Sequence, residues 1–427
     1  MSKNRLPFEG IRVCDFTWFA AGPIATKMLA DHGAEVIKIE SMVHFDRLRF
    51  VQPVADDKAG NLNCGGFFNN FNTSKLGMVL NLEKPKALEI ATKLILASDI
   101  VVENFSPRVM EKFDLTYERF ASIKPELIWV DQPMQGLTGP HKYYAGYGAL
   151  ITPLGGLAHL TGFPNRPPIG TGTNYTDYVI NCGHLFIAIV AALRHRQKTG
   201  KGQHVVMSQF ESAVSILETA ILDYTVNGRA HVRNGNRIPH AAPHGVYGCK
   251  GEDRDCVYIT AKGPKKGKKN DRWCVMAVFN DEQWRAFCQV LGDPPWTKDP
   301  KFETLADLKE NEDELDRLIE EWTKGRSPEE IMHQMQQAGV PAGVVQDAED
   351  ILTRDPHIKD RGYYIYLDHA EAGRIANDGL PFRLSETPGQ LSRPAPLMGE
   401  HTEYVCQEIL GMTEEETNQC YVDEVFL

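Results

Sequence analysis

The sequence predicts an α/β protein with a mostly parallel sheet, and three observations support this prediction. Its 427 residues are 42% hydrophobic and 9% aromatic, which is typical of a globular protein with roughly two to three domains. The segment 10–40 has the order strand, turn, helix, strand, which is a βαβ unit. The same alternation of short apolar runs and helical stripes continues to residue 208, and it implies parallel strands covered by helices on both faces.

The βαβ unit begins with the apolar, β-branched run at 11–16. A turn at 21–23 leads to a helix at 24–31, and a second strand follows at 34–40. A dinucleotide-binding turn needs the pattern G-x-G-x-x-G, because pyrophosphate must approach the backbone closely. Only Gly22 lies in this turn, so the unit disfavours NAD, although its helix N-terminus can hold another anion.

The later elements extend the same sheet. Further strands are predicted at 78–82, 100–102, 127–130 and 204–208, and further helices at 87–95, 117–123, 178–196 and 210–224. Ligands of such sheets bind outside the carboxyl ends of the strands. The loops expected to border a binding site are therefore 17–23, 40–48, 103–110 and 131–140.

A smaller α/β domain is predicted downstream. The segment 233–247 is a loop rich in Gly, Pro, His and Arg, and a strand at 257–260 follows it. Five lysines then gather among glycines and a proline, and we expect them to form a solvated loop: Lys262, Lys265, Lys266, Lys268 and Lys269. A helix capped by Ser327 is predicted to end near Gly339.

Charge, cysteine spacing and hydropathy exclude several classes of function. The formal net charge of −11 disfavours nucleic acids and anionic membranes as partners. The nine cysteines include no C-x-x-C pair, so neither a disulfide framework nor a zinc site is predicted. The longest apolar run, Leu185 to Leu193, is far shorter than the roughly 20 residues of a membrane-spanning helix. Because the N-terminus lacks a signal-peptide apolar region, we expect a cytoplasmic protein. We expect neither a metal ion nor a permanently bound cofactor.

An ordered set of sequence blocks resembles the class III coenzyme A transferase family, which includes the formyl-CoA, carnitine and benzylsuccinate CoA-transferases. The blocks are GIRVCDFTWFAAGPIATKMLADHGAEVIKIE, NTSKLGMVLNL, VVENFSPRVMEKF, TDYVINCGHLFIAIVAALRHRQKTGKGQHVVMSQFE, APHGVYGC, AGVPAGVV and GEHTEYVCQEILG. Together they cover most of the chain in family order. No single block is decisive, but the ordered set is specific.

The resemblance implies a Rossmann-like large domain built from both termini, residues 1–208 and 388–427, which binds CoA. It also implies a small α/β domain at 231–345. Linkers at 209–230 and 346–387 would leave a hole in each protomer, and two protomers of the family pass through one another as an interlocked dimer. The partner is expected to be a second copy of the chain or a related subunit.

Two roles are predicted for Asp177. The residues alone assign it to a helix N-cap, because Asp commonly precedes an apolar helical run. The resemblance makes it the nucleophile, which attacks the donor thioester and forms an aspartyl anhydride and then an aspartyl-CoA thioester. The roles are compatible, since a helix N-terminus keeps a carboxylate ionised. Each acyl step passes through an oxyanion, so backbone amides are expected nearby.

The resemblance also implies which residues bind the coenzyme. They are Lys75, Asn104, Phe105, Arg108 and Met110. The chain departs from the family pattern N-F-R-P-G with Ser106-Pro107-Arg108, so Arg108 is the candidate replacement for the missing arginine. Lys75 is alternatively a solvated turn residue, and the lysine cluster 262–269 alternatively reaches the CoA phosphates.

The candidate substrate-binding residues lie on loops that should border the site. They are Trp18, Phe19, Ala20, Tyr147, His240 and His244. The histidines lie where the family has a lid over the acyl group, although either can instead satisfy a turn backbone. Formyl-CoA transferases carry Gln at the position of Ala20 and Glu near Gly139, so oxalate is disfavoured. The aromatic loops favour a bulky or aromatic acid such as an arylsuccinate, with succinyl-CoA as donor.

Four alternatives remain. The first is a 2-methylacyl-CoA racemase-type epimerase, but the racemases carry His in an A-G-H-D block where this chain has Tyr147, a poor base at neutral pH. The second is a carnitine-type CoA-transferase. The third is a partner subunit of a heteromeric transferase, in which the presence of Asp177 would make this chain the active one. The fourth, an NAD-dependent enzyme, is disfavoured by the missing glycines.

Overall fold

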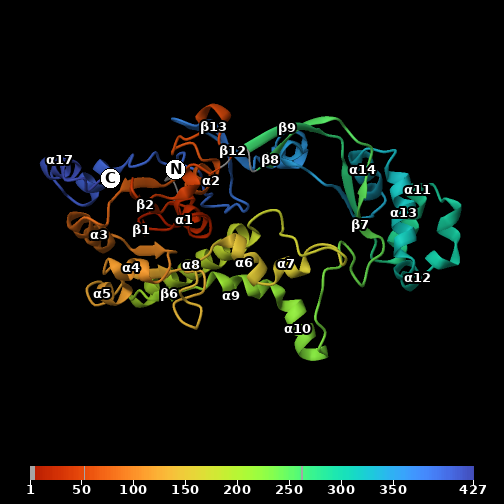
Figure 1. Ribbon diagram of the computed structural model, residues 1–427, viewed down its shortest axis with the longest axis horizontal. Coiled ribbons are helices and arrows are strands. Elements are labelled where there is room, and N and C mark those ends of the chain that lie inside the picture. Colours follow the sequence, from red (N-terminus) through yellow and green to blue (C-terminus); the bar gives the residue numbers. More distant parts are fainter. Residues whose placement is uncertain (1–4, 52, 261–262) are drawn as a thin grey trace. The chain divides into compact units, whose positions relative to one another are not determined.

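The computed structural model describes residues 5–51, 53–260 and 263–427, and the chain divides into two compact units (Figure 1). The first unit contains the chain up to Leu160 together with Pro168–His231 and Pro356–Leu427. The second contains Thr161–Pro167 and Val232–Asp355. Segments from both ends of the sequence therefore build the first unit.

A six-stranded parallel sheet forms the centre of the first unit, as the alternation of elements predicts. Its strands are β1 (Arg12–Asp15), β2 (Glu35–Glu40), β3 (Leu76–Val79), β4 (Ile100–Glu103), β5 (Ile128–Asp131) and β6 (His204–Val206). Their order in space is β3-β2-β1-β4-β5-β6, which is that of a doubly wound fold. The order reverses between β1 and β4, and ligands of such sheets bind near this point.

Successive side chains of each strand pack into cores on opposite faces of the sheet, because side chains alternate across a sheet. On one face, the core of Val13, Val36 and Val102 packs against α1 (Ala21–Asp31) and α8 (Cys182–Thr199). On the other, Cys14, Ile37 and their neighbours pack against α3 (Pro85–Ala97) and the C-terminal helices η8 (Val405–Ile409) and α17 (Glu414–Val422). Burial on both faces explains the almost continuous apolar sequence of the strands.

The other elements of the first unit are short. They are η1 (Arg47–Arg49), η2 (Asp56–Lys58), α2 (Gly66–Phe71), α4 (Arg108–Lys112), α5 (Tyr117–Ala121), α6 (Gly148–Leu154), α7 (Leu157–Leu160), η3 (Thr176–Asn181), α9 (Gln209–Val214), η4 (Ser215–Leu217), α10 (Glu218–Asn227), α15 (Pro356–Arg361), α16 (Thr402–Tyr404) and the hairpin β12 (Tyr364–His369) and β13 (Gly373–Asp378). The expected linker at 209–230 is thus the helices α9 and α10, which belong to this unit.

The second unit is a small α/β structure. Its antiparallel sheet, in the order β11-β10-β7, is covered by helices with a core around Phe287, Leu315 and Ile331. The elements are β7 (His244–Gly248), β8 (Arg254–Thr260), β9 (Gly263–Lys269), β10 (Trp273–Ala277), α11 (Asp281–Leu291), η5 (Pro295–Lys298), η6 (Pro300–Phe302), α12 (Leu305–Glu310), α13 (Glu312–Thr323), α14 (Pro328–Gln337), β11 (Ala342–Val344) and η7 (Asp350–Arg354). Ser327 caps α14 as predicted, because its side chain accepts a hydrogen bond from the Glu330 amide.

The expectation that the lysine cluster forms a loop is wrong for the lysines that the structure describes. Residues 265–269 lie on β9, which pairs with β8 along its length, while Lys262 lies outside the described residues. Acidic side chains offset the repulsion between these lysines, because Lys268 pairs with Asp255 at 2.6 Å and Lys269 with Asp347 at 2.5 Å. Lys268 is largely exposed, so its pair contributes little to stability.

One helix of the first unit has the length and composition of a membrane span. The helical run Thr176–Thr199 reaches a mean hydropathy of 1.5, and 44% of its most apolar window is buried inside the structure. The uninterrupted apolar run at 185–193 is much shorter than this helix, so the run alone does not indicate the helix's length. Leu185, Ile189 and Ala192 pack on the sheet, as in the core helix of a globular domain, so length and hydropathy alone are weak evidence for a span.

Candidate active site

Asp177 lies buried in the first turn of the long helix. The π-helical turn η3 begins at Thr176 and continues directly into α8, and its N-cap position is Tyr175. The carbonyl of Asn174 accepts hydrogen bonds from the amides of Asp177 and Tyr178, so the helix starts before the apolar run. The prediction that Asp177 is the N-cap is therefore wrong. π-helical turns of this kind are frequent at functional sites.

Two donors hold the Asp177 carboxylate. Nδ2 of Asn181, one turn along the helix, lies 3.2 Å from Oδ1, and the backbone N–H of Gly148 also donates to the carboxylate. The residue is only 5% exposed. Burial raises the pKa of Asp177 to about 6, because loss of water disfavours the charged form more than the two donors favour it. The group is therefore ionised but poorly solvated at neutral pH.

Gly148 is the first residue of α6, and no sequence pattern identified it. A Cβ atom at this position would lie 2.0 Å from Oδ2 of Asp177, so only glycine allows the contact. Thr152 lies one turn further on. Its Oγ1 shares a hydrogen bond with Oγ1 of Thr176 at 3.2 Å, and this bond joins α6 to η3. Asn181 was also missed, although its i+4 spacing from Asp177 on a helix is a usable signal.

An aromatic pair lies next to this contact. The rings of Phe19 and Tyr147 stack with centroids 5.9 Å apart, and Tyr147 directly precedes Gly148. Phe19 has a φ of 63°, which is unfavourable for a side chain of this size, and its amide donates to Asp46 at 3.1 Å. Tyr147 is 54% exposed, whereas Ala20 is buried. Two of the predicted substrate residues are therefore held together beside Asp177.

A cavity of about 460 Å³ lies at the carboxyl ends of the first four strands, where ligands of doubly wound sheets bind. Four of the predicted ligand residues line it, namely Trp18, Phe105, Arg108 and Met110. The ring of Trp18 meets Phe105 edge to face at 5.1 Å, and its buried Nε1–H has no partner among the described residues. Apolar walls with a guanidinium in the lining suit a nucleotide base and its phosphates.

The predicted ligand Asn104 supports this cavity without lining it. Its side-chain amide accepts a hydrogen bond from the Trp18 amide and donates one to the Trp18 carbonyl, each at 2.8 Å. Both polar atoms are thus used on the backbone of the 17–23 loop. Asn104 therefore orients Trp18.

Lys75 is part of the core, so the alternative that it is a solvated turn residue is wrong. Its side chain is fully buried, and Nζ donates to Asp15 at 3.0 Å, to Thr26 at 2.8 Å and to Asn72 at 2.9 Å. Burial lowers the pKa of Lys75 to about 8, which the carboxylate of Asp15 partly offsets. Lys75 is neither solvated nor placed to contact a phosphate.

A pair of acids lies at the ends of β4 and β5. Glu103 and Asp131 are adjacent in the sheet register, and burial together with its neighbour raises the pKa of Glu103 well above its ordinary value. Asp131 contacts His204 and accepts from Trp129 Nε1 at 3.0 Å. Oε2 of Glu103 accepts from the Phe105 amide at 2.7 Å, so this pair supports the cavity wall.

The two predicted lid histidines belong to the second unit. Both rings contact Phe279, with centroid distances of 6.2 Å for His240 and 6.3 Å for His244. His244 also donates from Nδ1 to the carbonyl of Asn236, which is the alternative role of satisfying a turn backbone. Among the residues that the structure describes, no group of three or more His, Cys, Asp or Glu side chains is placed to hold a metal ion.

Comparison with known proteins defines the class to which this fold and site belong. Residues 8–269 and 267–402 match the family described as CoA-transferase family III, and the chain belongs to that family. It is therefore a CoA-transferase of class III, an enzyme class whose substrates are CoA thioesters.

Individual relatives match the chain over nearly its whole length. It is 30% identical over 413 residues, 96% of each chain, to succinyl-CoA–D-citramalate CoA-transferase of Chloroflexus aurantiacus. It is 28% identical over 410 residues to succinate–glutarate CoA-transferase of Agrobacterium fabrum, covering 96% of this chain and 97% of the relative. A CAIB/BAIF family protein from Brucella suis superposes with a TM-score of 0.82 at 28% identity, covering 95% of this chain and 100% of the other.

Proposed function

We propose that the protein transfers CoA from succinyl-CoA to a carboxylic acid, with Asp177 as the nucleophile. The observation that carries the proposal is the contact between the buried Asp177 carboxylate and the Gly148 amide at the start of α6. A carboxylate with little solvation is a stronger nucleophile than one in water. The relatives named for succinyl-CoA and for succinate support this choice of donor.

The reaction consists of four acyl transfers. An oxygen of Asp177 attacks the thioester carbonyl of succinyl-CoA, and the C–S bond breaks. CoA thiolate is released, and a mixed anhydride of succinate and Asp177 is formed. The thiolate then attacks the Asp177 carbonyl of the anhydride, which releases succinate and leaves an aspartyl-CoA thioester. The acceptor carboxylate attacks this thioester and expels the thiolate again. The thiolate finally attacks the acceptor carbonyl of the new anhydride, forming acceptor-CoA and regenerating Asp177.

The Gly148 amide has a role in the steps at the aspartyl carbonyl. In the resting enzyme it donates to the carboxylate of Asp177. When that carbon becomes tetrahedral, the same N–H can donate to the oxyanion, and such a donor is worth about 3 kcal/mol. Because the donor is a helix N-terminal amide fixed by α6, no reorganisation is needed during the reaction.

The cavity beside Trp18 and Phe105 is proposed to hold the adenine end of CoA, with Arg108 on its phosphates. Loop 17–23 joins this cavity to the Phe19–Tyr147 stack, so the coenzyme can extend from one to the other. Lys75 has no part in this proposal, because it is buried against Asp15.

The acceptor is proposed to be a dicarboxylic acid that carries a bulky or aromatic group, such as an arylsuccinate. The names of the two relatives contain D-citramalate and glutarate, both dicarboxylates. The exposed ring of Tyr147, stacked on Phe19, offers an aromatic surface beside the nucleophile. A panel of citramalate, glutarate, benzylsuccinate and carnitine, each with succinyl-CoA, separates this acceptor from the simpler dicarboxylates and from a carnitine-type transferase.

The protein is proposed to act as an interlocked dimer in the cytoplasm, either with a second copy or with a related subunit. The long helix exposes apolar side chains that a second protomer would bury, because Val179 is 52% exposed and Ile187 65% exposed. Native mass spectrometry of the chain expressed alone tests the homodimer. A monomer that gains activity only with a second subunit would support the heteromeric form.

The decisive experiment traps the covalent intermediate. Enzyme incubated with succinyl-CoA and quenched should carry CoA on the Asp177 peptide, and hydroxylamine should convert that adduct to a hydroxamate. Asp177→Asn should lose both the adduct and the exchange of labelled succinate into succinyl-CoA, whereas the control Asp223→Asn, on α10 and away from the site, should keep them. Full exchange activity in Asp177→Asn would refute the mechanism. Exchange of an α-hydrogen of 2-methylacyl-CoA with D₂O, without CoA transfer, would identify a racemase-type epimerase instead.

A further inference from the structure

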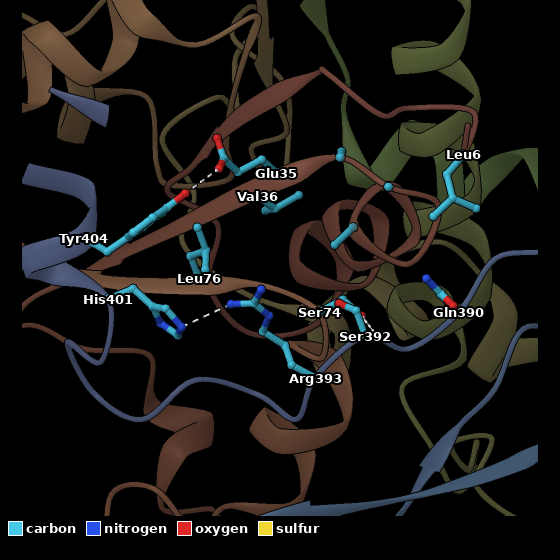
Figure 2. A pocket seen from close by; sticks show the side chains of 13 residues that line it. Leu6, Glu35, Val36, Ser74, Leu76, Gln390, Ser392, Arg393, His401 and Tyr404 are labelled. Atoms are coloured by element: carbon cyan, nitrogen blue, oxygen red, sulfur yellow. Dashed lines mark hydrogen bonds between the residues drawn. The ribbon is translucent and has the colours of Figure 1, made fainter. Parts of the chain in front are cut away.

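A second cavity of the first unit lies at the amino ends of β2 and β3, away from the strand ends that border the proposed CoA site. Its volume is about 420 Å³. Figure 2 shows Arg393 and His401 facing each other at one end, with Glu35 and Tyr404 at another. No step of the proposed transfer uses these residues.

The hydrogen bonds of His401 leave a ring N–H facing a second donor. The amide of Gly77, fixed in β3, donates to Nδ1 of His401 at 3.2 Å, and the His401 amide donates to the Gly77 carbonyl at 2.8 Å. Burial lowers the pKa of His401, so the ring is neutral at neutral pH. With Nδ1 accepting, the ring proton must lie on Nε2. Nε2–H then faces Nη1 of Arg393 at 3.2 Å, and a guanidinium can only donate.

Arg393 is exposed, so its guanidinium repels the ring N–H of His401 only partly, and an acceptor between the two donors would relieve this repulsion. The opposite tautomer does not remove the conflict, because Nδ1–H would then face the Gly77 amide. Arg393 cannot relieve it through an ion pair in the present arrangement, since no carboxylate of the described residues lies within salt-bridge distance of it. An oxyanion between Arg393 and His401 would accept from both groups.

The charges that line the cavity also favour an anion. Glu35 lines it, but Arg12 neutralises this carboxylate at 2.5 Å. Arg393 is therefore the lining charge without a counter-charge among the described residues. Between the two ends, the walls contain the apolar side chains of Val36 and Leu76, which can contact the rest of a ligand (Figure 2).

We propose that this cavity binds a small oxyanion, a carboxylate or a phosphate, between the guanidinium of Arg393 and Nε2–H of His401. The ligand's apolar part would lie against Val36 and Leu76. Because the site is formed by the strands and the C-terminal segment of the first unit, it is separate from Asp177 and does not depend on the proposed transfer reaction.

Calorimetric titration of the full chain tests the site with two probes, butyrate and inorganic phosphate, in chloride-free buffer containing saturating CoA. We expect saturable binding of one ion per chain. Arg393→Gln should weaken it roughly tenfold or more, because it removes a charge-assisted hydrogen bond, whereas Arg393→Lys should weaken it less. Arg374→Gln, an exposed arginine on β13, makes the same charge change away from the cavity and should bind as wild type does.

The outcomes are distinct. Tighter binding of butyrate assigns a carboxylate ligand, and tighter binding of phosphate assigns a phosphate. Equal binding by wild type and Arg393→Gln, or no saturable binding of either probe, would overturn the proposal. Saturable binding that is seen without CoA but lost in saturating CoA would also overturn it, because the ions would then occupy the coenzyme cavity. None of these readouts depends on transferase activity.

Discussion

Gly148 and Asp177 lie so close that a Cβ atom at position 148 would be 2.0 Å from the Asp177 carboxylate. Gly148→Ala must therefore push the carboxylate away from its amide donor. We expect kcat to fall about 100-fold, which is typical of a displacement of about 1 Å at a reacting group. Steady-state kinetics measures the effect. Gly170→Ala is the matched control, because a Cβ there meets nothing within 4 Å, and it should keep full activity.

The raised pKa of Asp177 predicts an acid limb in the rate profile. The protonated acid is not a nucleophile, so kcat/KM for succinyl-CoA should fall tenfold per pH unit below about 6, the pKa of Asp177, and level off above it. The profile is measured between pH 4.5 and 8 in buffers of constant ionic strength. A rate that stays flat down to pH 5 would contradict the assignment of the nucleophile.

The raised pKa of Asp177 also predicts that Asp177→Asn increases the free energy of unfolding at neutral pH. A carboxyl group whose folded pKa is raised binds more protons in the folded state, so it costs stability as pH rises from about 4 to about 6 and costs a constant amount above that. Asp177→Asn removes the cost while keeping an oxygen for the Gly148 amide. Urea unfolding at pH 7.5 should show a gain of about 1–3 kcal/mol. The gain should vanish near pH 4, and a gain that persists there would have another origin.

Lys75 should act on stability and leave CoA binding unchanged. Lys75→Met leaves the buried carboxylate of Asp15 without its cation, and breaking a buried pair in this way costs about 3–5 kcal/mol. The double variant Asp15→Asn/Lys75→Met should recover part of this loss, since it leaves no unpaired charge. Denaturant unfolding gives both values. A raised KM for succinyl-CoA with unchanged stability would restore Lys75 as a coenzyme ligand.

Tyr147 should affect the acceptor more than the donor. Tyr147→Ala removes the ring stacked on Phe19, and we expect the KM of an aromatic acceptor to rise about fivefold to tenfold, as loss of an aromatic contact does. Tyr147→Phe keeps the stack and should stay near wild type. Exposed Tyr224 on α10 provides the control Tyr224→Ala. Equal effects of Tyr147→Ala on KM for succinyl-CoA and for the acceptor would argue against an acceptor site here.

Much of the large unit could be predicted because burial leaves a pattern in the chain. β4 and β5 are buried on both faces, and their apolar runs were found within one residue of the observed bounds. The lysine-rich β9 was missed, because its strand depends on pairing with β8 and on acids that neutralise it. The local composition indicates neither the pairing with β8 nor the acids that neutralise the lysines.

The candidate site was predictable in part for the same reason. Trp18 is predicted from its place on a loop at a strand end, because such loops converge in a doubly wound sheet, whereas Phe105 and Arg108 come from the family resemblance; all three line the cavity. The burial of Lys75 could not be predicted, since nothing near it in the sequence indicates that Asp15 will lie 3.0 Å from its ammonium group. Gly148 was missed because a close approach to a side chain 29 residues later leaves no local signal.

The two-ended construction of the large unit constrains the order in which a growing chain can fold. The core beneath β3 and α3 contains Val405, Cys406 and Phe426, and the Asn81 amide donates to the Val425 carbonyl at 2.9 Å. This core cannot close until that segment has left the ribosome. The main part of the second unit, Val232–Asp355, emerges earlier and can fold first. Until synthesis nears its end, the sheet that carries the proposed CoA cavity exposes one apolar face to chaperones.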